Sequence, residues 1–176
     1  MRVRPETSAD VPVVHEVVEA AFGGAQVPRL LDALRTSVAW LGLSFVAEQD
    51  GEILGHVSYT RAWVDAPDRV VEVLVLSPLS VRPDHQRHGV GTTLVHDSLA
   101  LLQGRDEPLV FLEGDPGYYR RLGWHPASDW GFTAPSVRIP EAAFQAVRLP
   151  SYDEAVTGAL VYPDVFWRHD CVGLRP

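Results

Sequence analysis

The chain has 176 residues and a formal net charge of -8, and it is 46% hydrophobic and 22% charged. This length fits one domain with a real core, and the composition is that of a globular protein rather than a disordered one. The acidic balance excludes general nucleic-acid binding, which needs a broad basic surface. The chain contains no lysine, which excludes a P-loop.

The compartment is indicated by the N-terminal segment and by the cysteine content. MRVRPETSAD lacks the apolar stretch of a secretory signal, and no run approaches the ~18 apolar residues of a membrane span. Cys171 is the single cysteine, so no internal disulfide can form. We therefore expect a cytoplasmic protein with no membrane association.

The first forty residues predict one strand and two helices. Residues 2–5 read as a strand, and Thr7 or Ser8 can cap the following helix, with Asp10 in a capping-box-like position. Gly23 ends that helix. The apolar face of the first helix comprises Val14, Val17, Val18, Ala21 and Phe22, and a weaker helical pattern comprises Leu30, Leu31, Leu34 and Val38.

Three strands are expected next. LSFVAEQ and EILGHVSYTRAWV are joined by Asp50-Gly51, a strong signal for a two-residue hairpin turn. A turn at residues 66–68 precedes RVVEVLVL, which is apolar at nearly every position and therefore reads as a central strand covered on both faces.

The second half alternates helices and strands. A helix is expected from Gly89 to Gln103, with Val90, Leu94, Val95, Leu101 and Leu102 on its apolar face. PLVFLEG predicts a buried strand, GYYRRLGW a short helix stopped by Gly123, and the region after Trp124 irregular strands that finish the sheet. The fold class is therefore α/β with a mixed sheet, whose portion 70–114 is parallel and right-handed.

The stretch VRPDHQRHGVGTTLV, residues 81–95, predicts an anion site. A helix start exposes unpaired N–H groups, and Gly89 and Gly91 let the backbone approach a phosphate closely. Arg87 supplies positive charge, and Arg82, His85 and His88 can add more. A dinucleotide is disfavoured, because Leu94 stands at the sixth position where G-x-G-x-x-G needs glycine.

Gln86-Arg87-His88-Gly89-Val90-Gly91 spells Q-x-x-G-x-G, with Leu79-Ser80-Val81 upstream. This pattern resembles the acetyl-coenzyme A signature of the GNAT family of N-acetyltransferases. The resemblance implies acetyl-coenzyme A as co-substrate, with its pyrophosphate on the backbone amides of residues 87–92. The cofactor-binding residues that it implies are Leu79, Ser80, Val81, Gln86, Arg87, His88, Gly89, Val90, Gly91 and Thr92.

Pro78 interrupts the expected fourth strand. A proline removes a hydrogen-bond donor, so it belongs at an edge or a bulge. In the GNAT fold this strand splays from the next, and pantetheine pairs with it. By resemblance the backbone of Leu79 and Val81 would face pantetheine, and an amide near Leu79 would stabilise the oxyanion. The alternative is a strand that ends at Leu76 and turns.

Two catalytic residues are predicted. Tyr118 to Trp124 resembles the family's Y-x-x-x-G-F segment, in which the tyrosine matching Tyr119 protonates the leaving thiolate; a phenol of pKa ~10 suits that role. The alternative for Tyr119 is a packing aromatic. Glu72 is the candidate general base, because burial in VVEVLVL would raise its pKa. The alternatives are a strand-entry carboxylate paired with an arginine, and a water acting as the base.

Other polar residues have structural interpretations. His85 and His88 could lie near each other with Asp84, but the sequence suggests no further ligands to complete a metal site, so none is expected. His56, within a hairpin strand, is expected to be structural. Asp115 and Pro116 depart from the asparagine that is frequent in the family at this point.

The resemblance covers residues 2 to 125, and GDPGYYRRLGW is similar to a bacterial subgroup of predicted acetyltransferases. We expect one GNAT-like domain over 1–176, with a splayed fourth strand, flanking helices, and residues 126–176 as C-terminal strands completing the sheet. The implied reaction is acetyl transfer from acetyl-coenzyme A to an amine by direct attack in a ternary complex. The acceptor is a small molecule or a peptide, and a homodimer is left open. The alternatives are an acyl-coenzyme A sensor or interaction module without turnover, and a structural domain with an incidental loop.

Overall fold

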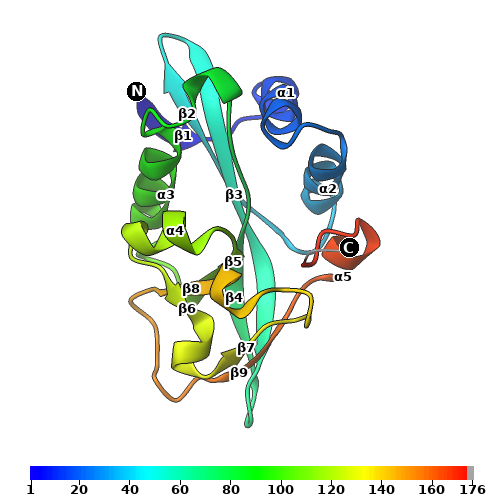
Figure 1. The fold of residues 1–176 in the computed structure, drawn as a ribbon, viewed down its shortest axis with the longest axis vertical. Helices are drawn as coiled ribbons and strands as arrows, with labels where there is room; N and C mark the ends of the chain where they lie inside the picture. Colours follow the sequence, from blue (N-terminus) through cyan, green and yellow to red (C-terminus); the bar gives the residue numbers. More distant parts are fainter. Residues whose placement is uncertain (174–176) are drawn as a thin grey trace. The chain divides into compact units, whose positions relative to one another are not determined.

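A computed structural model describes residues 1–173 (Figure 1). The chain forms two compact units. Unit 1 combines Met1–Thr60 with Leu76–Leu102, and unit 2 combines Arg61–Val75 with the described residues from Gln103 onward. Two long strands pass from one unit to the other, so each contributes residues to both.

Unit 1 contains an antiparallel sheet. Strand β1 (Arg2–Pro5) pairs with β2 (Trp40–Gln49), and β2 pairs with the long strand β3 (Glu52–Asp65). The turn between β2 and β3 has positive φ angles at both central residues, 53° at Asp50 and 84° at Gly51. These angles are those of a type I′ turn, so the predicted hairpin is confirmed.

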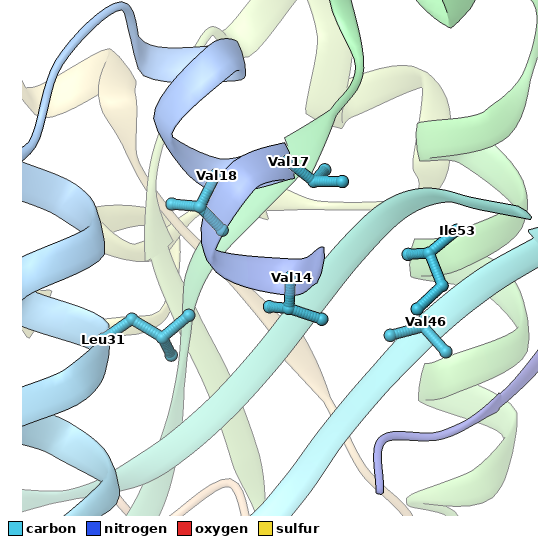
Figure 2. Packing of buried hydrophobic residues seen from close by; sticks show 6 residues of the cluster. All are labelled: Val14, Val17, Val18, Leu31, Val46 and Ile53. Carbon is cyan, nitrogen blue, oxygen red and sulfur yellow. The ribbon is translucent and has the colours of Figure 1, made fainter. Parts of the chain in front are cut away.

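Helices α1 (Val11–Phe22) and α2 (Gln26–Arg35) cover this hairpin. Figure 2 shows a cluster of buried side chains between them, composed of Val14, Val17, Val18, Leu31, Val46 and Ile53. Burying a side chain of this size contributes roughly 1.5–3 kcal/mol. Val14, Val17 and Val18 of the predicted apolar face therefore form a core, whereas Phe22, which was expected on the same face, is 49% exposed. Gly23, at φ 69°, ends the helix as expected.

The predicted start of α1 is wrong by two or three residues, depending on which of the two predicted caps is taken. The helix begins at Val11, and neither Thr7 nor Ser8 caps it. The Asp10 carboxylate instead accepts bonds from the Thr7 amide and hydroxyl, at 2.8 Å each, and from Arg4. The turn from Thr7 to Asp10 is thus a separate structure that Arg4 stabilises.

The second helix also ends earlier than its pattern indicates. α2 stops at Arg35, and Val38 is 81% exposed. The hydroxyls of Thr36 and Ser37 donate to the carbonyls of Ala33 and Leu34, at 3.1 and 2.8 Å. These bonds satisfy carbonyls of the last turn, so the chain leaves the helix there.

Unit 1 also contains α3 (Val90–Leu101), which packs closely on β3. A Cβ placed on Gly55 would lie 2.8 Å from the Ser80 carbonyl oxygen and 2.9 Å from Leu94 Cδ1. The contact is completed by Tyr59, whose hydroxyl lies 2.6 Å from Ser98 Oγ. The predicted apolar face is buried except at Leu101, which is 56% exposed.

Unit 2 continues the sheet. Strand β5 (Leu109–Glu113) pairs in parallel with β4 (Val70–Val81), which confirms the predicted parallel portion. The C-terminal region supplies four more strands, β6 (His125–Pro126), β7 (Phe132–Thr133), β8 (Phe144–Arg148) and β9 (Gly158–Val161). β8 pairs with β5 and with β6, while β9 pairs with β3 and with β7.

Two short helices belong to unit 2. The predicted helix of GYYRRLGW is α4 (Pro116–Tyr119), followed by a 3₁₀ turn that ends at Gly123, where φ is 84°. The expectation of irregular strands after Trp124 is wrong at α5 (Asp164–Arg168), which is a helix. Pro163 precedes this helix, and Phe166 turns inward against Tyr162, with ring centroids 5.0 Å apart.

Aromatic rings organise the rest of unit 2. Phe111 of β5 meets Phe132 edge-on, with ring centroids 5.1 Å apart, and stacks on Phe144, with ring centroids 5.5 Å apart.

No helix in the described part of the chain is long and apolar enough to cross a membrane.

Candidate functional site

The loop between β4 and α3 has an unusual backbone. After a 3₁₀ turn at Pro83–His85, the φ angles are 63° at Arg87 and 85° at Gly89. The Gln86 side chain closes the loop by donating to the Val81 carbonyl at 3.2 Å. Two left-handed residues separated by one position turn the chain abruptly into the helix.

This turn decides which amides precede the first hydrogen bond of α3. The first bond of the helix is donated by the Thr93 amide to the Gly89 carbonyl, at 2.9 Å. The amides of Val90, Gly91 and Thr92 precede it, and within residues 1–173 no backbone acceptor is recorded for them. A Cβ on Gly89 would meet nothing within 4 Å, so the approach is open. A helix start with free amides and the positive end of its dipole suits a phosphate group.

The positive charge around this loop differs from the expectation. Arg87 and His88 are exposed. Arg82 and His85 are instead drawn to Asp84, with Arg82 Nη2 at 3.1 Å and His85 Nδ1 at 3.0 Å from its carboxylate. These hydrogen bonds, from His85 first, lower the pKa of Asp84 to about 2. The Arg87 guanidinium is therefore free of this carboxylate, and His88 lies exposed beside it.

Strand β4 runs through Pro78 to Val81, so the alternative in which it ends at Leu76 is wrong. Its recorded pairs with β5 are Leu74 with Val110 and Val75 with Phe111. For the rest of β4, no pairing with β5 is recorded within the described residues, which agrees with a splayed fourth strand.

Leu79 and Val81 are half-buried, whereas Ser80 is buried. The Ser80 hydroxyl donates to the His56 carbonyl at 3.4 Å. The Ser80 side chain therefore belongs to the contact with β3, and backbone contacts of Leu79, Ser80 and Val81 with a cofactor stay a prediction.

Tyr119 lies in unit 2 with a buried ring. The ring packs over the backbone of Gly114, where an added Cβ would lie 2.8 Å from Tyr119 Cδ2, and edge-on against Trp124 at 5.7 Å. Asp115 caps α4 by accepting from the Gly117 amide at 2.8 Å. The departure from the family's asparagine thus has a local role in starting the helix that carries Tyr119.

Glu72 is not buried as expected. Its side chain is 42% exposed, and Arg61 Nε lies 2.8 Å from Oε1. It lines a cavity of about 620 Å³ at the start of β4 and β5, together with Arg69, Arg105 and Glu107. The expectation of a buried glutamate in VVEVLVL is wrong, because the strand is covered only from Val73 onward. Glu72 instead matches the alternative interpretation, in which it is a strand-entry carboxylate paired with an arginine.

A buried polar group in unit 1 was not predicted. His56 of β3 is fully buried, and its Nε2 lies 2.8 Å from the Ser44 hydroxyl and 3.4 Å from Glu6 Oε2. Arg35 Nη2 lies 2.5 Å from Glu6 Oε1. The sequence carries one signal for it: His56, Ser58 and Thr60 alternate along a strand, which puts three polar side chains on one face.

The chemistry of the remaining polar groups offers no metal site. Within residues 1–173, no group of three or more histidine, cysteine, aspartate or glutamate side chains is arranged to hold a metal ion.

Comparison with known proteins assigns the class. The family described as "Acetyltransferase (GNAT) domain" matches residues 2–127. The chain belongs to the GNAT family of acetyltransferases, and it is an acyltransferase with a mixed sheet flanked by helices.

Three individual proteins are similar to it. The uncharacterized N-acetyltransferase YjhQ of Escherichia coli K12 is 33% identical over 135 residues, 76% of this chain and 74% of that protein. The crystal structure of YhbS from Escherichia coli in complex with CoA has a TM-score of 0.83 and 26% identity, and the match covers 95% of this chain and 92% of that one. A GNAT family acetyltransferase from Brucella melitensis in complex with acetyl-CoA has a TM-score of 0.75 and 30% identity, covering 94% and 97%.

Proposed function

We propose that this protein transfers an acetyl group from acetyl-coenzyme A to an amine, by direct attack in a ternary complex. The observation that carries the proposal is the start of α3, where the amides of Val90, Gly91 and Thr92 have no recorded backbone acceptor. Arg87 adds positive charge there, and His88 lies exposed beside it. The similar structures with CoA and acetyl-CoA support the same ligand.

The proposed mechanism divides the work between backbone and side chains. The backbone of Leu79 and Val81 pairs with pantetheine, and the amide near Leu79 stabilises the oxyanion as the amine attacks the thioester carbonyl. The C–S bond breaks, and the Tyr119 hydroxyl donates a proton to the departing thiolate. The remaining cofactor contacts come from Ser80 and from residues 86–92.

Glu72 is the side chain that the sequence predicts as general base. Glu72 stays a prediction, but its exposure and its ion pair with Arg61 favour a structural carboxylate. A Glu72→Gln variant is therefore expected to keep kcat within threefold. A loss of 100-fold would restore Glu72 as the base, because removing a general base typically costs 10²–10⁴-fold.

The acceptor, the other partners and the location of the enzyme are predicted from the sequence. The acceptor is a small-molecule or peptide amine, and nucleic acid and membrane are not expected partners. A cytoplasmic location, a single domain over 1–176 and a homodimer left open remain predictions. No metal ion is assigned a role.

The first test is binding. Coenzyme A at 100 times its dissociation constant should stabilise the protein by about 2.7 kcal/mol, measured by thermal unfolding with and without ligand. Gly89→Val should abolish the shift, because a β-branched residue cannot adopt φ 85° and would disturb the loop. Gly24→Val is the matched control, since nothing lies within 4 Å of its added Cβ. Absence of any shift in the unaltered protein contradicts the proposal.

The second test separates an enzyme from a sensor. Release of free thiol from acetyl-coenzyme A is followed with spermidine, tyramine, alanine and a peptide with a free N-terminal alanine. Tyr119→Phe should lower kcat by about 100-fold with an unchanged KM for acetyl-coenzyme A. Tyr118→Phe serves as the neighbouring control. Tight coenzyme binding with no turnover of any amine would instead support the sensor or interaction module.

A further inference from the structure

Two serine side chains attach strand β4 to β3. The Ser58 hydroxyl of β3 donates to the Ser77 carbonyl at 2.8 Å, and the Ser80 hydroxyl of β4 donates to the His56 carbonyl at 3.4 Å. Ser58 and Ser80 are buried, so water competes little for these bonds. Leu79, whose amide is the proposed oxyanion donor, lies between the two attached residues.

The direction of the Leu79 amide follows from the pairing of β4 with β3. The Arg82 amide donates to the Leu54 carbonyl of β3 at 2.9 Å. Amides along a strand point alternately to its two sides, so the Ser80 amide also points to β3 and the Leu79 amide points away from it. On the other side of β4 is β5, and within the described residues its recorded pairs with β4 end at Val75. The Leu79 amide is therefore directed away from the β3 ladder, as an oxyanion donor must be.

Few torsions separate the Ser77 carbonyl from the Leu79 amide. The Ser77 carbonyl lies in the planar peptide unit that links Ser77 to Pro78, and the Leu79 amide lies in the next planar unit. Only φ and ψ of Pro78 relate the two planes, and the proline ring fixes φ. A bond that fixes the Ser77 carbonyl therefore leaves a single free torsion before the Leu79 amide. This restraint gives a role to Pro78, which is buried in a strand from which it removes a hydrogen-bond donor.

We propose that Ser58 is a positioning residue, which holds the Leu79 amide where it donates to the thioester oxygen during acetyl transfer. In this role Ser58 acts through the Ser77 carbonyl, and Pro78 transmits the restraint. The position matters because an oxyanion donor stabilises the developing charge only at hydrogen-bond distance from the oxygen. A misplacement of about 1 Å can cost about 100-fold in rate. The proposal rests on the acetyl-transfer function proposed above.

The remaining attachments of β4 to β3 do not depend on Ser58. The Ser80 hydroxyl keeps its bond, and the Ser80 carbonyl stays packed against Gly55, whose added Cβ would lie 2.8 Å from it. Loss of the Ser58 hydroxyl therefore releases the Ser77 end of this segment and leaves the loop of residues 86–92 in place. Coenzyme A should bind a Ser58 variant as it binds the unaltered protein, and the defect should lie in the chemical step.

The kinetic test compares two buried serines that face each other across the hairpin. Ser58 pairs with Ser44 of β2, whose hydroxyl donates to Glu6. The amine is whichever of spermidine, tyramine, alanine and the alanine peptide reacts fastest. Ser58→Ala should lower kcat by about 10–100-fold with an unchanged KM for acetyl-coenzyme A. Ser44→Ala loses a buried hydroxyl that does not hold β4, so it should keep the wild-type kcat.

A second readout follows the thioester carbonyl directly and needs no amine. The infrared stretching frequency of acetyl-coenzyme A labelled with ¹³C at this carbonyl should fall when it binds the unaltered protein or Ser44→Ala, because a hydrogen-bond donor polarises the bond. The fall should be smaller in Ser58→Ala, in which the amide is no longer held. It should also be smaller in Pro78→Ala, in which φ of residue 78 is no longer fixed by a ring.

The outcomes separate this proposal from the proposed function. Equal kcat in Ser58→Ala and Ser44→Ala, or a fall in carbonyl frequency of wild-type size in Ser58→Ala, overturns the positioning role and leaves acetyl transfer intact. Coenzyme binding without turnover of any amine by the unaltered protein contradicts the proposed function, and the carbonyl frequency then decides whether Ser58 positions the amide. Should Ser58→Ala not fold, Pro78→Ala carries both measurements, and wild-type values in it overturn the proposal.

Discussion

Asp10 shows how one carboxylate can organise a segment without capping a helix. It accepts from both Nη atoms of Arg4, at 2.7 and 2.9 Å, and from the amide and hydroxyl of Thr7, at 2.8 Å each. The residue is 8% exposed, so these bonds are little screened by solvent. The carboxylate therefore joins β1 to the turn that leads into α1.

Asp10→Asn should destabilise the protein by about 1.5–3 kcal/mol, the usual contribution of hydrogen bonds to a charged group. The hydrogen bonds from Arg4 hold the pKa of Asp10 far below its ordinary value. The unfolded chain binds this proton first, so the stabilisation is complete above pH ~4 and is lost as the pH falls. Urea unfolding between pH 3 and 7 measures it, with exposed Asp129→Asn as control. An equal loss at pH 7 and pH 3 contradicts the argument.

The pKa of Glu113 is shifted in the opposite direction to that of Asp10. Burial raises the pKa of this residue, although the Gly173 amide, 3.0 Å from Oε2, and the Tyr162 hydroxyl partly offset the shift. The folded protein therefore holds this proton longer than the unfolded chain does. The contribution of Glu113 to stability is fully present below its ordinary pKa and is lost as the pH rises through the raised pKa of the folded state.

Glu113→Gln should remove that decline, so its stability relative to wild type should increase as the pH rises from about 4. The comparison is made by urea unfolding over this range, with Glu141→Gln, an exposed glutamate, as control. A constant difference across the range would show that ionisation of Glu113 is not penalised by folding.

At the scale of elements, the close approach of α3 to the sheet depends on Gly55. The nearest atoms to an added Cβ are the Ser80 carbonyl oxygen at 2.8 Å, Leu94 Cδ1 at 2.9 Å and Val90 Cγ1 at 3.2 Å. The first of these is backbone and cannot move aside cheaply. Since Val90 begins α3, the same glycine positions the amides proposed to bind the diphosphate.

Gly55→Ala should cost about 1–3 kcal/mol by overpacking, and it should weaken coenzyme A binding severalfold. Gly24→Ala is the control, because its added methyl meets nothing within 4 Å. Denaturant unfolding and isothermal titration with coenzyme A measure the two effects. An unchanged affinity for coenzyme A in a destabilised variant would show that the packing of α3 against Gly55 does not position the loop proposed to bind the diphosphate.

Elements could be predicted where local patterns agree with packing. The hairpin at Asp50-Gly51 and the helix ended by Gly23 follow from turn and cap chemistry. The start of α1 could not be predicted, because it depends on a bond between Arg4 and Asp10, two residues whose contact the sequence does not show. α5 was missed because a short apolar run fits a strand as well as a helix.

The candidate site also has a part that the sequence predicts and a part that depends on contacts between distant segments. Q-x-x-G-x-G is contiguous, so the sequence places the loop of residues 86–91 directly. The surroundings of Glu72 depend on Arg61 and on where burial of β4 begins. The group around His56 unites residues from separate segments, and only the alternation of polar residues along β3 indicated it.

At the scale of the whole molecule, the chain continues well beyond the family match, which ends at residue 127. The later residues supply β8, which pairs with β5 along its entire length, from Leu109 to Glu113. They also supply both aromatic partners of Phe111. The family domain of this chain therefore depends on its C-terminal segment for a covered sheet edge and a filled core.

A chain truncated after Ala127 should lose cooperative unfolding and aggregate, because β5 becomes an unprotected edge and Phe111 is uncovered. Circular dichroism and sedimentation of the truncated and full chains test this. A truncated chain that unfolds cooperatively at the midpoint of the full chain would show that residues 128–176 are dispensable for folding.

All the long basic side chains of this sequence are arginines. This has a chemical consequence for a protein proposed to bind an activated thioester. Lysine is the side chain that reactive acyl donors modify, and this sequence has none. The protein can therefore remain in concentrated acetyl-coenzyme A without accumulating adducts on its side-chain amines, and amine-detecting reagents will report the acceptor rather than the enzyme.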